Sequence, residues 1–255
     1  MARTVRSSLP MKLDGARNCR DLGGYPTIYG TNTAGGQFLR SDNPSKFTED
    51  DLQRLYDYGV RLQIDFRSPK EASGDATSKL KGYKNVEYIL TEMIDEIHSA
   101  DAEGGVNTVS HDLPATLGEL YIGFLDTKKH VYLRTLRNCL RHMDDCIFFN
   151  CTAGKDRTGT FAMIMMKVAG VSDEDVVIDY QITGDNIKVD MDAMYASYGP
   201  NPPFDIDYLR SRPVHMEKAL AHLNANYGTI EHWMSLAGLA ENEIVALRNK
   251  MLGQY

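Results

Sequence analysis

The sequence predicts an α/β fold with a mainly parallel central sheet flanked by helices, and with a helical C-terminal part. Predicted strands alternate with predicted helices along the chain, which is typical of an α/β sandwich. Residues 146–150 form a continuous apolar run, as expected of a strand buried on both faces of a parallel sheet. Residues 158–169 are apolar almost all round, which indicates a buried helix soon after that strand.

Three strands and one helix are expected in the first third of the chain. Residues 37–40 fit a short edge strand after an irregular N-terminal arm, and residues 60–66 alternate apolar and polar side chains. Residues 86–90 form a further candidate strand. Before the second strand, Thr48 and Asp51 are spaced as in a helix capping box, and Gly59 is a glycine of the kind that ends helices.

The second half is mostly helical in pattern. The expected helices are 117–142, 158–169, 175–182, 213–227, 230–237 and 241–251. Residues 91–116 show no sustained periodicity. A long irregular segment between ordered elements is often functional, so we expect a lid insertion there, with an ordinary surface excursion as the alternative.

Length and composition limit the classes of protein. The 255 residues contain no linker-like stretch, so we expect a single domain, 1–255. The net charge of −7 disfavours binding to nucleic acid, and no apolar stretch suits integral membrane association or a secretory leader. Four cysteines without metal or disulfide spacing indicate free thiols in a reducing cytoplasm, although export without a leader stays open.

The most specific feature is the segment 150–159, Asn-Cys-Thr-Ala-Gly-Lys-Asp-Arg-Thr-Gly, between the buried strand and the buried helix. Cys151 and Arg157 are six positions apart, and Thr158 follows at once. The Cys-x5-Arg spacing alone is weak evidence. The hydroxyl residue, the two glycines and the strand–loop–helix context make it a specific signal for a phosphate loop, the name used here for residues 151–157.

Each residue type in this loop suits phosphoryl transfer. Its backbone N–H groups would form an anion-binding nest at a helix N-terminus. The residues expected to bind phosphate are Thr152, Ala153, Gly154, Lys155, Asp156 and Arg157. Arg157 can hold two phosphoryl oxygens with its planar fork, and the positive surroundings favour the thiolate of Cys151 as nucleophile. Thr158 can donate a hydrogen bond to the sulfur, and Gly154 and Gly159 allow tight turns.

This loop resembles the Cys-x-Ala-Gly-Lys-Asp-Arg-Thr-Gly loop of the bacterial tyrosine/serine phosphatases, some of which act on phosphoinositides. The resemblance also covers Asn18-Cys-Arg-Asp-Leu-Gly-Gly-Tyr25, residues 38–42, residues 64–71 and residues 227–248. It therefore extends nearly from end to end. It implies a cysteine-phosphatase-like fold, with no cofactor and no metal site.

The resemblance also implies that Asp156, within the loop, is the general acid and then the base. The alternative places the acid on a separate segment, at Asp95, Asp112 or Asp126. Lys155 is expected either to steer a second acidic group of the substrate or to be exposed to solvent.

Two further residues, Asp65 and Asn150, are expected to support the site, and the sequence leaves their contacts open. Asp65, at the end of the strand 60–66, would either orient Arg157 or the loop, or form a buried ion pair with Arg67. Asn150 stands where the family usually has a histidine. An asparagine can donate hydrogen bonds to brace the loop, but it carries no positive charge.

These observations predict a cysteine-dependent phosphomonoesterase that acts through a phosphocysteine intermediate, as a protein tyrosine or dual-specificity phosphatase. A phosphoinositide phosphatase and a non-catalytic phosphate-binding pseudophosphatase are the alternatives. The expected partners are phosphorylated protein or phosphoinositide substrates, with inorganic phosphate as product and ligand. The sequence predicts no oligomeric state.

Overall fold

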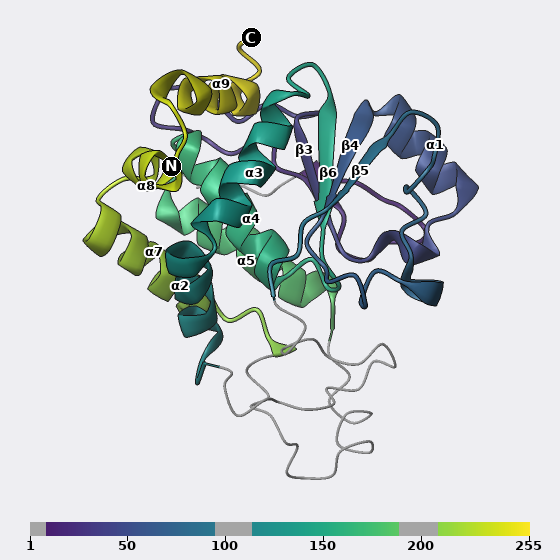
Figure 1. Ribbon diagram of the computed structural model, residues 1–255, viewed down its shortest axis with the longest axis horizontal. Coiled ribbons are helices and arrows are strands. Elements are labelled where there is room, and N and C mark those ends of the chain that lie inside the picture. The colour runs from purple at the N-terminus through teal and green to yellow at the C-terminus, as the bar shows by residue number, and fades with distance from the viewer. Residues whose placement is uncertain (1–8, 95–113, 189–208) are drawn as a thin grey trace, which may run out of the picture.

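A six-stranded sheet forms the centre of the computed structural model, which describes residues 9–94, 114–188 and 209–255 (Figure 1). The strands lie in the order β1 (Leu9–Pro10), β2 (Arg20–Asp21), β3 (Phe38–Ser41), β6 (Cys146–Asn150), β4 (Val60–Asp65) and β5 (Glu87–Leu90). Strands β3, β6, β4 and β5 are parallel to one another. β1 pairs with β2 in antiparallel orientation, and so does β2 with β3. The predicted mainly parallel sheet is confirmed.

The strand predicted over residues 37–40 is present as β3, but its placement at the sheet edge was wrong. β3 pairs with β6 on one side and with β2 on the other, where Arg20 lies opposite Arg40. The extra strands come from the N-terminal arm. Each contains two residues, which is too short to show a periodic pattern.

The two faces of the sheet carry separate apolar cores. In β6, Ile147 and Phe149 lie in the larger core, whereas Cys146 and Phe148 lie in the smaller one. Successive side chains of a strand point to opposite faces, so a strand covered on both faces must be apolar throughout. This burial explains the apolar run and holds the strand that leads into the phosphate loop.

Helix α1 (Glu49–Asp57) covers the face with the smaller core (Figure 1). The predicted capping box is present. The Oγ1 of Thr48 accepts from the N–H of Asp51 at 3.1 Å, and the Asp51 carboxylate accepts from the N–H of Thr48 at 3.0 Å. Gly59 follows the helix with a φ of 106°, a conformation that favours glycine.

The other helices cover the opposite face (Figure 1). They are α2 (Leu117–Thr127), α3 (Lys129–Leu140), α4 (Asp156–Val168), α5 (Asp173–Asn186), α7 (Pro213–Tyr227), α8 (Ile230–Ala237) and α9 (Glu241–Leu252). The predicted helical C-terminal part is confirmed, and α4 is buried along almost its whole length. Two 3₁₀ turns, Pro44–Lys46 and Gly74–Ala76, complete the described elements.

The single helix predicted over residues 117–142 is two helices. The chain leaves the helical conformation at Lys128, with φ −102° and ψ 20°. The two halves have different packing partners, because α2 packs on α7 whereas α3 packs on α8 and α9. The periodicity of apolar residues continues across the break and therefore does not reveal it.

Most of the expected lid, residues 91–116, lies outside the described residues. Of its apolar side chains, Met93 is fully buried in the larger core, and Ile94 is partly buried against that core. Among the described residues, no helix combines the length and the apolar character needed to cross a membrane.

Candidate active site

The predicted site residues come together between β6 and α4. β6 ends at Asn150, the phosphate loop follows, and α4 begins at Asp156. Cys151 is only 2% exposed and Arg157 8%. The loop therefore places the thiol and the guanidinium in a largely buried position at the N-terminus of a buried helix.

Six consecutive carbonyl oxygens, from residue 150 to residue 155, accept hydrogen bonds from the surrounding protein. In chain order of the acceptors, the donors are Phe66 N, Asn150 Nδ2, Asn43 N, Asn18 Nδ2, Arg40 Nη2 and Gly159 N, at 2.6–3.2 Å. A carbonyl that is bound from outside cannot turn toward an anion inside the loop. This set of bonds therefore gives the loop its orientation.

The N–H groups of the loop are in the opposite situation. Within the described chain, the N–H groups of Thr152, Ala153, Gly154 and Arg157 have no acceptor. Of these residues, Gly154 and Arg157 are buried, and buried backbone N–H groups are otherwise almost always paired. N–H groups without an acceptor, at the positive end of the α4 dipole, are the features expected of an anion-binding nest.

Gly154 is required at its position for two reasons. Its φ is +67°, and a Cβ there would lie 2.4 Å from the carbonyl oxygen of Ser41. The sequence also predicted that Gly159 allows a tight turn, and the backbone does not support this prediction. Gly159 lies inside α4, and a Cβ would meet Tyr180 at an ordinary 3.4 Å.

Glu71 is a site residue that the sequence reasoning missed. It accepts from both terminal nitrogens of Arg157, at 2.7 and 2.8 Å, and from the hydroxyl of Thr152 at 2.8 Å. Burial raises the pKa of Glu71, but the hydrogen bonds and charge of Arg157 outweigh it and lower the pKa to about 2. A signal for it was present in the sequence, since Glu71 is the last residue of the block 64–71, on which the family resemblance partly rests.

The contact with Glu71 also sets which edge of Arg157 is available. Glu71 binds the end of the guanidinium, and the Nε–H of Arg157 has no acceptor within the described residues. The side edge, formed by Nε and Nη2, is therefore the one left for two phosphoryl oxygens. Besides its bond to Glu71 at 2.8 Å, the Nη2 has the Thr152 hydroxyl at 3.3 Å.

Asp65 does not contact Arg157; it forms the buried ion pair with Arg67, at 2.7 Å. It still reaches the loop through Asn150, whose Nδ2 donates to Asp65 at 3.2 Å and to the carbonyl of Cys151 at 3.2 Å. Gln63 donates to the other side of the Asn150 amide at 2.8 Å. Asn150 thus braces the loop by hydrogen bonds, without a positive charge.

A buried ionic cluster supports the loop from behind. Arg40, which binds the carbonyl of Gly154, also pairs with Asp179 of α5. Arg20 binds the same Asp179 at 2.9 Å and the side-chain oxygen of Asn18 at 2.5 Å. Burial raises the pKa of Asp179, but the two arginines outweigh it and lower that pKa below its ordinary value. The N-terminal signature Asn18–Tyr25 therefore belongs to the scaffold of the loop.

Thr158 and Lys155 lie where the loop motif implies. The Oγ1 of Thr158 is buried and finds no hydrogen-bond partner among the described residues, which leaves it available to a sulfur or phosphoryl acceptor. Lys155 is 6% exposed, so the solvent-exposed alternative was wrong. Its Nζ lies 3.6 Å from the Oδ1 of Asp156.

The alternative acids are not placed at the loop by the described structure. Asp126 lies at the end of α2, where it accepts from Tyr227 at 2.6 Å and from the ring of His222 at 2.9 Å. Asp95 and Asp112 lie outside the described residues. Within the described ranges, no three His, Cys, Asp or Glu side chains gather in a way that would hold a metal ion.

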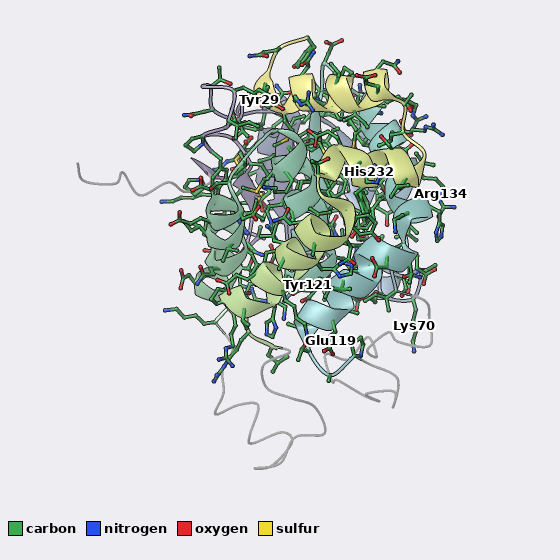
Figure 2. The ribbon with its side chains drawn as sticks, turned by 90° about the vertical axis from the view of Figure 1, so that its left-hand side faces the viewer. Tyr29, Lys70, Glu119, Tyr121, Arg134 and His232 are labelled. Atoms are coloured by element: carbon green, nitrogen blue, oxygen red, sulfur yellow. The ribbon has the colours of Figure 1, made fainter. Side chains whose placement is uncertain are left out.

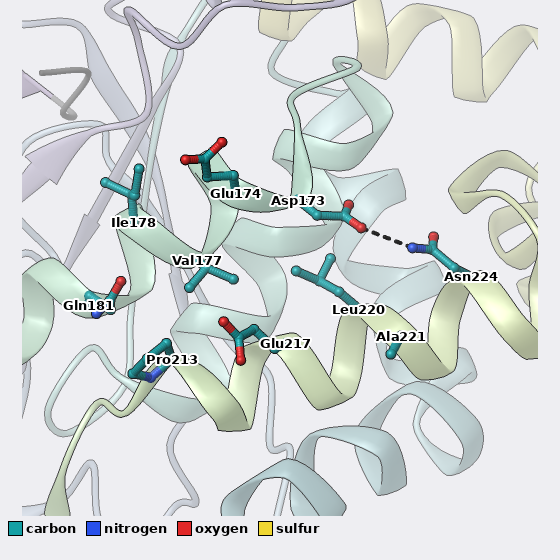
Figure 3. A pocket seen from close by; sticks show the side chains of 10 residues that line it. All are labelled: Asp173, Glu174, Val177, Ile178, Gln181, Pro213, Glu217, Leu220, Ala221 and Asn224. Carbon is teal, nitrogen blue, oxygen red and sulfur yellow. Dashed lines mark hydrogen bonds between the residues drawn. The ribbon is translucent and has the colours of Figure 1, made fainter. Parts of the chain in front are cut away.

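A hollow of about 600 Å³ between α5 and α7 is separate from the phosphate loop (Figure 3). Val177 and Leu220 form part of its apolar lining, and Asp173, Glu174 and Glu217 make it acidic. An acidic hollow disfavours an anionic phosphate ester, so the loop is the candidate site.

The profile of the tyrosine phosphatase family matches residues 11–253. The chain belongs to the tyrosine phosphatase family. A Cupriavidus necator protein whose name places it among the tyrosine-protein phosphatases is 26% identical over 265 residues, 98% of this chain and 91% of that protein. A tyrosine-protein phosphatase of Nostoc commune is 27% identical over 242 residues, 90% of this chain and 78% of that protein. The predicted phosphatase hydrolase family is confirmed.

Among solved structures, this phosphatase is similar to TpbA of P. aeruginosa and to the catalytic core of Siw14. TpbA aligns with a TM-score of 0.37 and 13% identity, over 82% of this chain and 90% of that one. Siw14 aligns with a TM-score of 0.39 and 16% identity, over 79% and 92%. At these scores the overlap is partial, and membership rests on the sequence match.

Replacing Gly154 tests the orientation of the loop in this tyrosine phosphatase. Gly154→Ala should lower kcat/KM by about 100-fold or more, because a displaced loop misplaces the reacting groups. Affinity for inorganic phosphate should fall with it. Gly159→Ala is the matched control, since its Cβ has room, and it should change both quantities little. Equal losses in the two variants would contradict the orientation argument.

The Glu71–Arg157 pair makes a prediction about acid stability. Glu71 has a folded-state pKa of about 2 against an ordinary 4.5, so its contribution is complete above the ordinary value and is lost as the pH falls toward 2. Glu71→Gln should therefore reduce the free energy of unfolding at pH 7 by on the order of 2 kcal/mol, and the difference should shrink with acidification.

Urea unfolding at several pH values measures this difference. Glu87→Gln is the control for an exposed carboxylate, because Glu87 pairs with Arg141 and His142 at 42% side-chain exposure and its loss should change the free energy of unfolding much less. A difference between wild type and Glu71→Gln that does not change with pH would count against the pair.

Proposed function

We propose that this chain hydrolyses phosphotyrosine in proteins, with Cys151 as nucleophile and a phosphocysteine as intermediate. The observation that carries the proposal is that one short loop, residues 151–157, holds the Cys151 thiol, the Nε–H of Arg157 and four backbone N–H groups that have no acceptor among the described residues. The names of the two sequence relatives support the substrate class.

In the first step the thiolate of Cys151 attacks phosphorus. The S–P bond forms while the bond between phosphorus and the tyrosyl oxygen breaks. Asp156 gives its proton to that oxygen, which leaves as a neutral phenol. The loop N–H groups and Arg157 bind the three equatorial phosphoryl oxygens, where negative charge accumulates.

In the second step water attacks the phosphocysteine. Asp156, now a carboxylate, takes a proton from the water as the new O–P bond forms. The S–P bond breaks, and its electron pair returns to Cys151. Thr158 donates a hydrogen bond to the sulfur and so makes it a better leaving group, which is consistent with its unpartnered Oγ1.

The depth of the nucleophile favours phosphotyrosine over the shorter phosphoserine. A thiol that is 2% exposed is easier to reach for a phosphoryl group at the end of a long aryl side chain. A phosphoinositide substrate is the second enzymatic candidate, because the buried Lys155 adds positive charge beside the loop. A pseudophosphatase would bind phosphate in the same nest without turnover.

Replacing the nucleophile separates catalysis from binding. Cys151→Ser should abolish turnover and retain affinity for phosphate, because the nest and Arg157 remain. Steady-state hydrolysis and phosphate titration measure the two effects. Cys139→Ala, which changes a free buried cysteine of α3, should stay active.

A substrate panel completes this experiment, with a phosphotyrosine peptide, a phosphoserine peptide and soluble phosphoinositides. The phosphotyrosine peptide should have the highest kcat/KM. A phosphoinositide preference would replace the proposed substrate, and phosphate binding by an inactive wild-type protein would establish the pseudophosphatase. Turnover by Cys151→Ser would exclude the cysteine mechanism.

The role of Asp156 predicts a dependence on the leaving group. Asp156→Asn should slow hydrolysis of a phosphotyrosine peptide, whose phenol has a pKa of about 10, by on the order of 10²–10⁴-fold. An activated aryl phosphate should be slowed much less, because it needs little protonation. Asp126→Asn is the control. If Asp95→Asn or Asp112→Asn shows this pattern instead, the acid lies on that segment.

A further inference from the structure

Two buried tyrosines connect Asp156 to the helical layer. The hydroxyl of Tyr121, on α2, donates to the Oδ1 of Asp156 at 2.5 Å. The hydroxyl of Tyr180, on α5, lies 2.8 Å from the hydroxyl of Tyr121. Tyr121 is fully buried and Tyr180 is 1% exposed, and their rings meet edge to face at 5.9 Å. Figure 2 places Tyr121 toward the same end of the molecule as Lys70 and Glu119.

The direction of the hydrogen bonds follows from counting protons. A tyrosine hydroxyl has one proton, and that of Tyr121 is given to Asp156. Tyr180 must then donate to Tyr121. Burial and the charge of Asp156 raise the pKa of both hydroxyls, so both remain neutral donors. The result is a one-way chain from Tyr180 through Tyr121 to Asp156.

The same contacts distinguish the two oxygens of Asp156. Oδ1 receives the hydrogen bond from Tyr121 and has the Nζ of Lys155 at 3.6 Å. No donor from the described residues reaches Oδ2, and the side chain as a whole is 26% exposed. Oδ2 is therefore the oxygen free to carry a proton and to exchange it.

We propose that Tyr121 is a positioning residue for the acid–base carboxyl, and that Tyr180 acts only through Tyr121. The inference rests on the proposed role of Asp156. Tyr121 holds Oδ1 in both protonation states, since a protonated Oδ2 leaves Oδ1 as an acceptor. The carboxyl thus keeps one rotamer while Oδ2 loses its proton in the first step and gains one in the second.

The decisive variant is Tyr121→Phe, which removes the hydroxyl and keeps the ring. For a phosphotyrosine peptide, kcat should fall about tenfold, the worth of one aligned hydrogen bond. For an activated aryl phosphate, kcat should change little. KM and the affinity for inorganic phosphate should stay near those of the wild type, because the nest and Arg157 are untouched.

The second variant tests whether Tyr180 acts through Tyr121. Tyr180→Phe alone should lower kcat for the peptide by a smaller factor, about threefold. In the Tyr121→Phe background, Tyr180→Phe should cause no further loss, because the acceptor of its hydrogen bond is already gone. Additive losses would show that Tyr180 acts independently and would overturn that part of the proposal.

Tyr132→Phe is the matched control for burial. Tyr132 is fully buried and donates to the hydroxyl of Thr160 at 2.9 Å, so the change removes a similar buried hydrogen bond without touching the Asp156 carboxyl. It should show no leaving-group dependence. A Tyr121→Phe variant that slows both substrates equally, or neither, would overturn the proposal.

The outcome for Asp156→Asn separates the two levels of inference. If that variant shows the leaving-group dependence and Tyr121→Phe does not, the positioning role alone fails. If Asp156→Asn shows none, the acid assignment itself fails.

Discussion

Outward-facing carbonyl groups are the condition on which this phosphate loop depends. An anion can approach the loop N–H groups only if the six carbonyl oxygens from residue 150 to residue 155 are bound elsewhere. Their donors come from the N-terminal arm, β3, Asn43 after β3, Phe66 directly after β4, β6 and α4. The positive φ of Gly154 lets the chain turn between these donors. Segments that are far apart in the sequence thus hold the phosphate loop in one backbone conformation.

Each buried guanidinium around the loop has a carboxylate partner. Arg157 pairs with Glu71, Arg67 with Asp65, and both Arg20 and Arg40 with Asp179. Buried ion pairs contribute little net stability, because desolvation of the two charges offsets their attraction. Their effect here is geometric. They hold planar donors at fixed angles and leave the loop N–H groups, the helix dipole and one edge of an arginine to attract phosphate.

Rigid packing keeps this arrangement in place. The rings of Phe149 in β6 and Phe161 in α4 meet edge to face at 5.0 Å, and Phe66 packs on Phe161 at 5.2 Å. The strand before the loop and the helix after it are therefore fastened to each other and to β4. Sites supported on strands and helices hold their geometry better than sites on free loops.

The sequence by itself determined the phosphate loop, the central strands and most helix limits, because their signals lie within a few neighbouring residues. Cys151 and Arg157 share one loop, and Thr48 caps its own helix. Only the tertiary structure decided the rest. It brings Glu71 into contact with Arg157 and Tyr121 into contact with Asp156. It also places β3 inside the sheet and breaks the helix at Lys128. These depend on contacts between segments far apart in the chain, and no local pattern of residues specifies which distant side chains will meet.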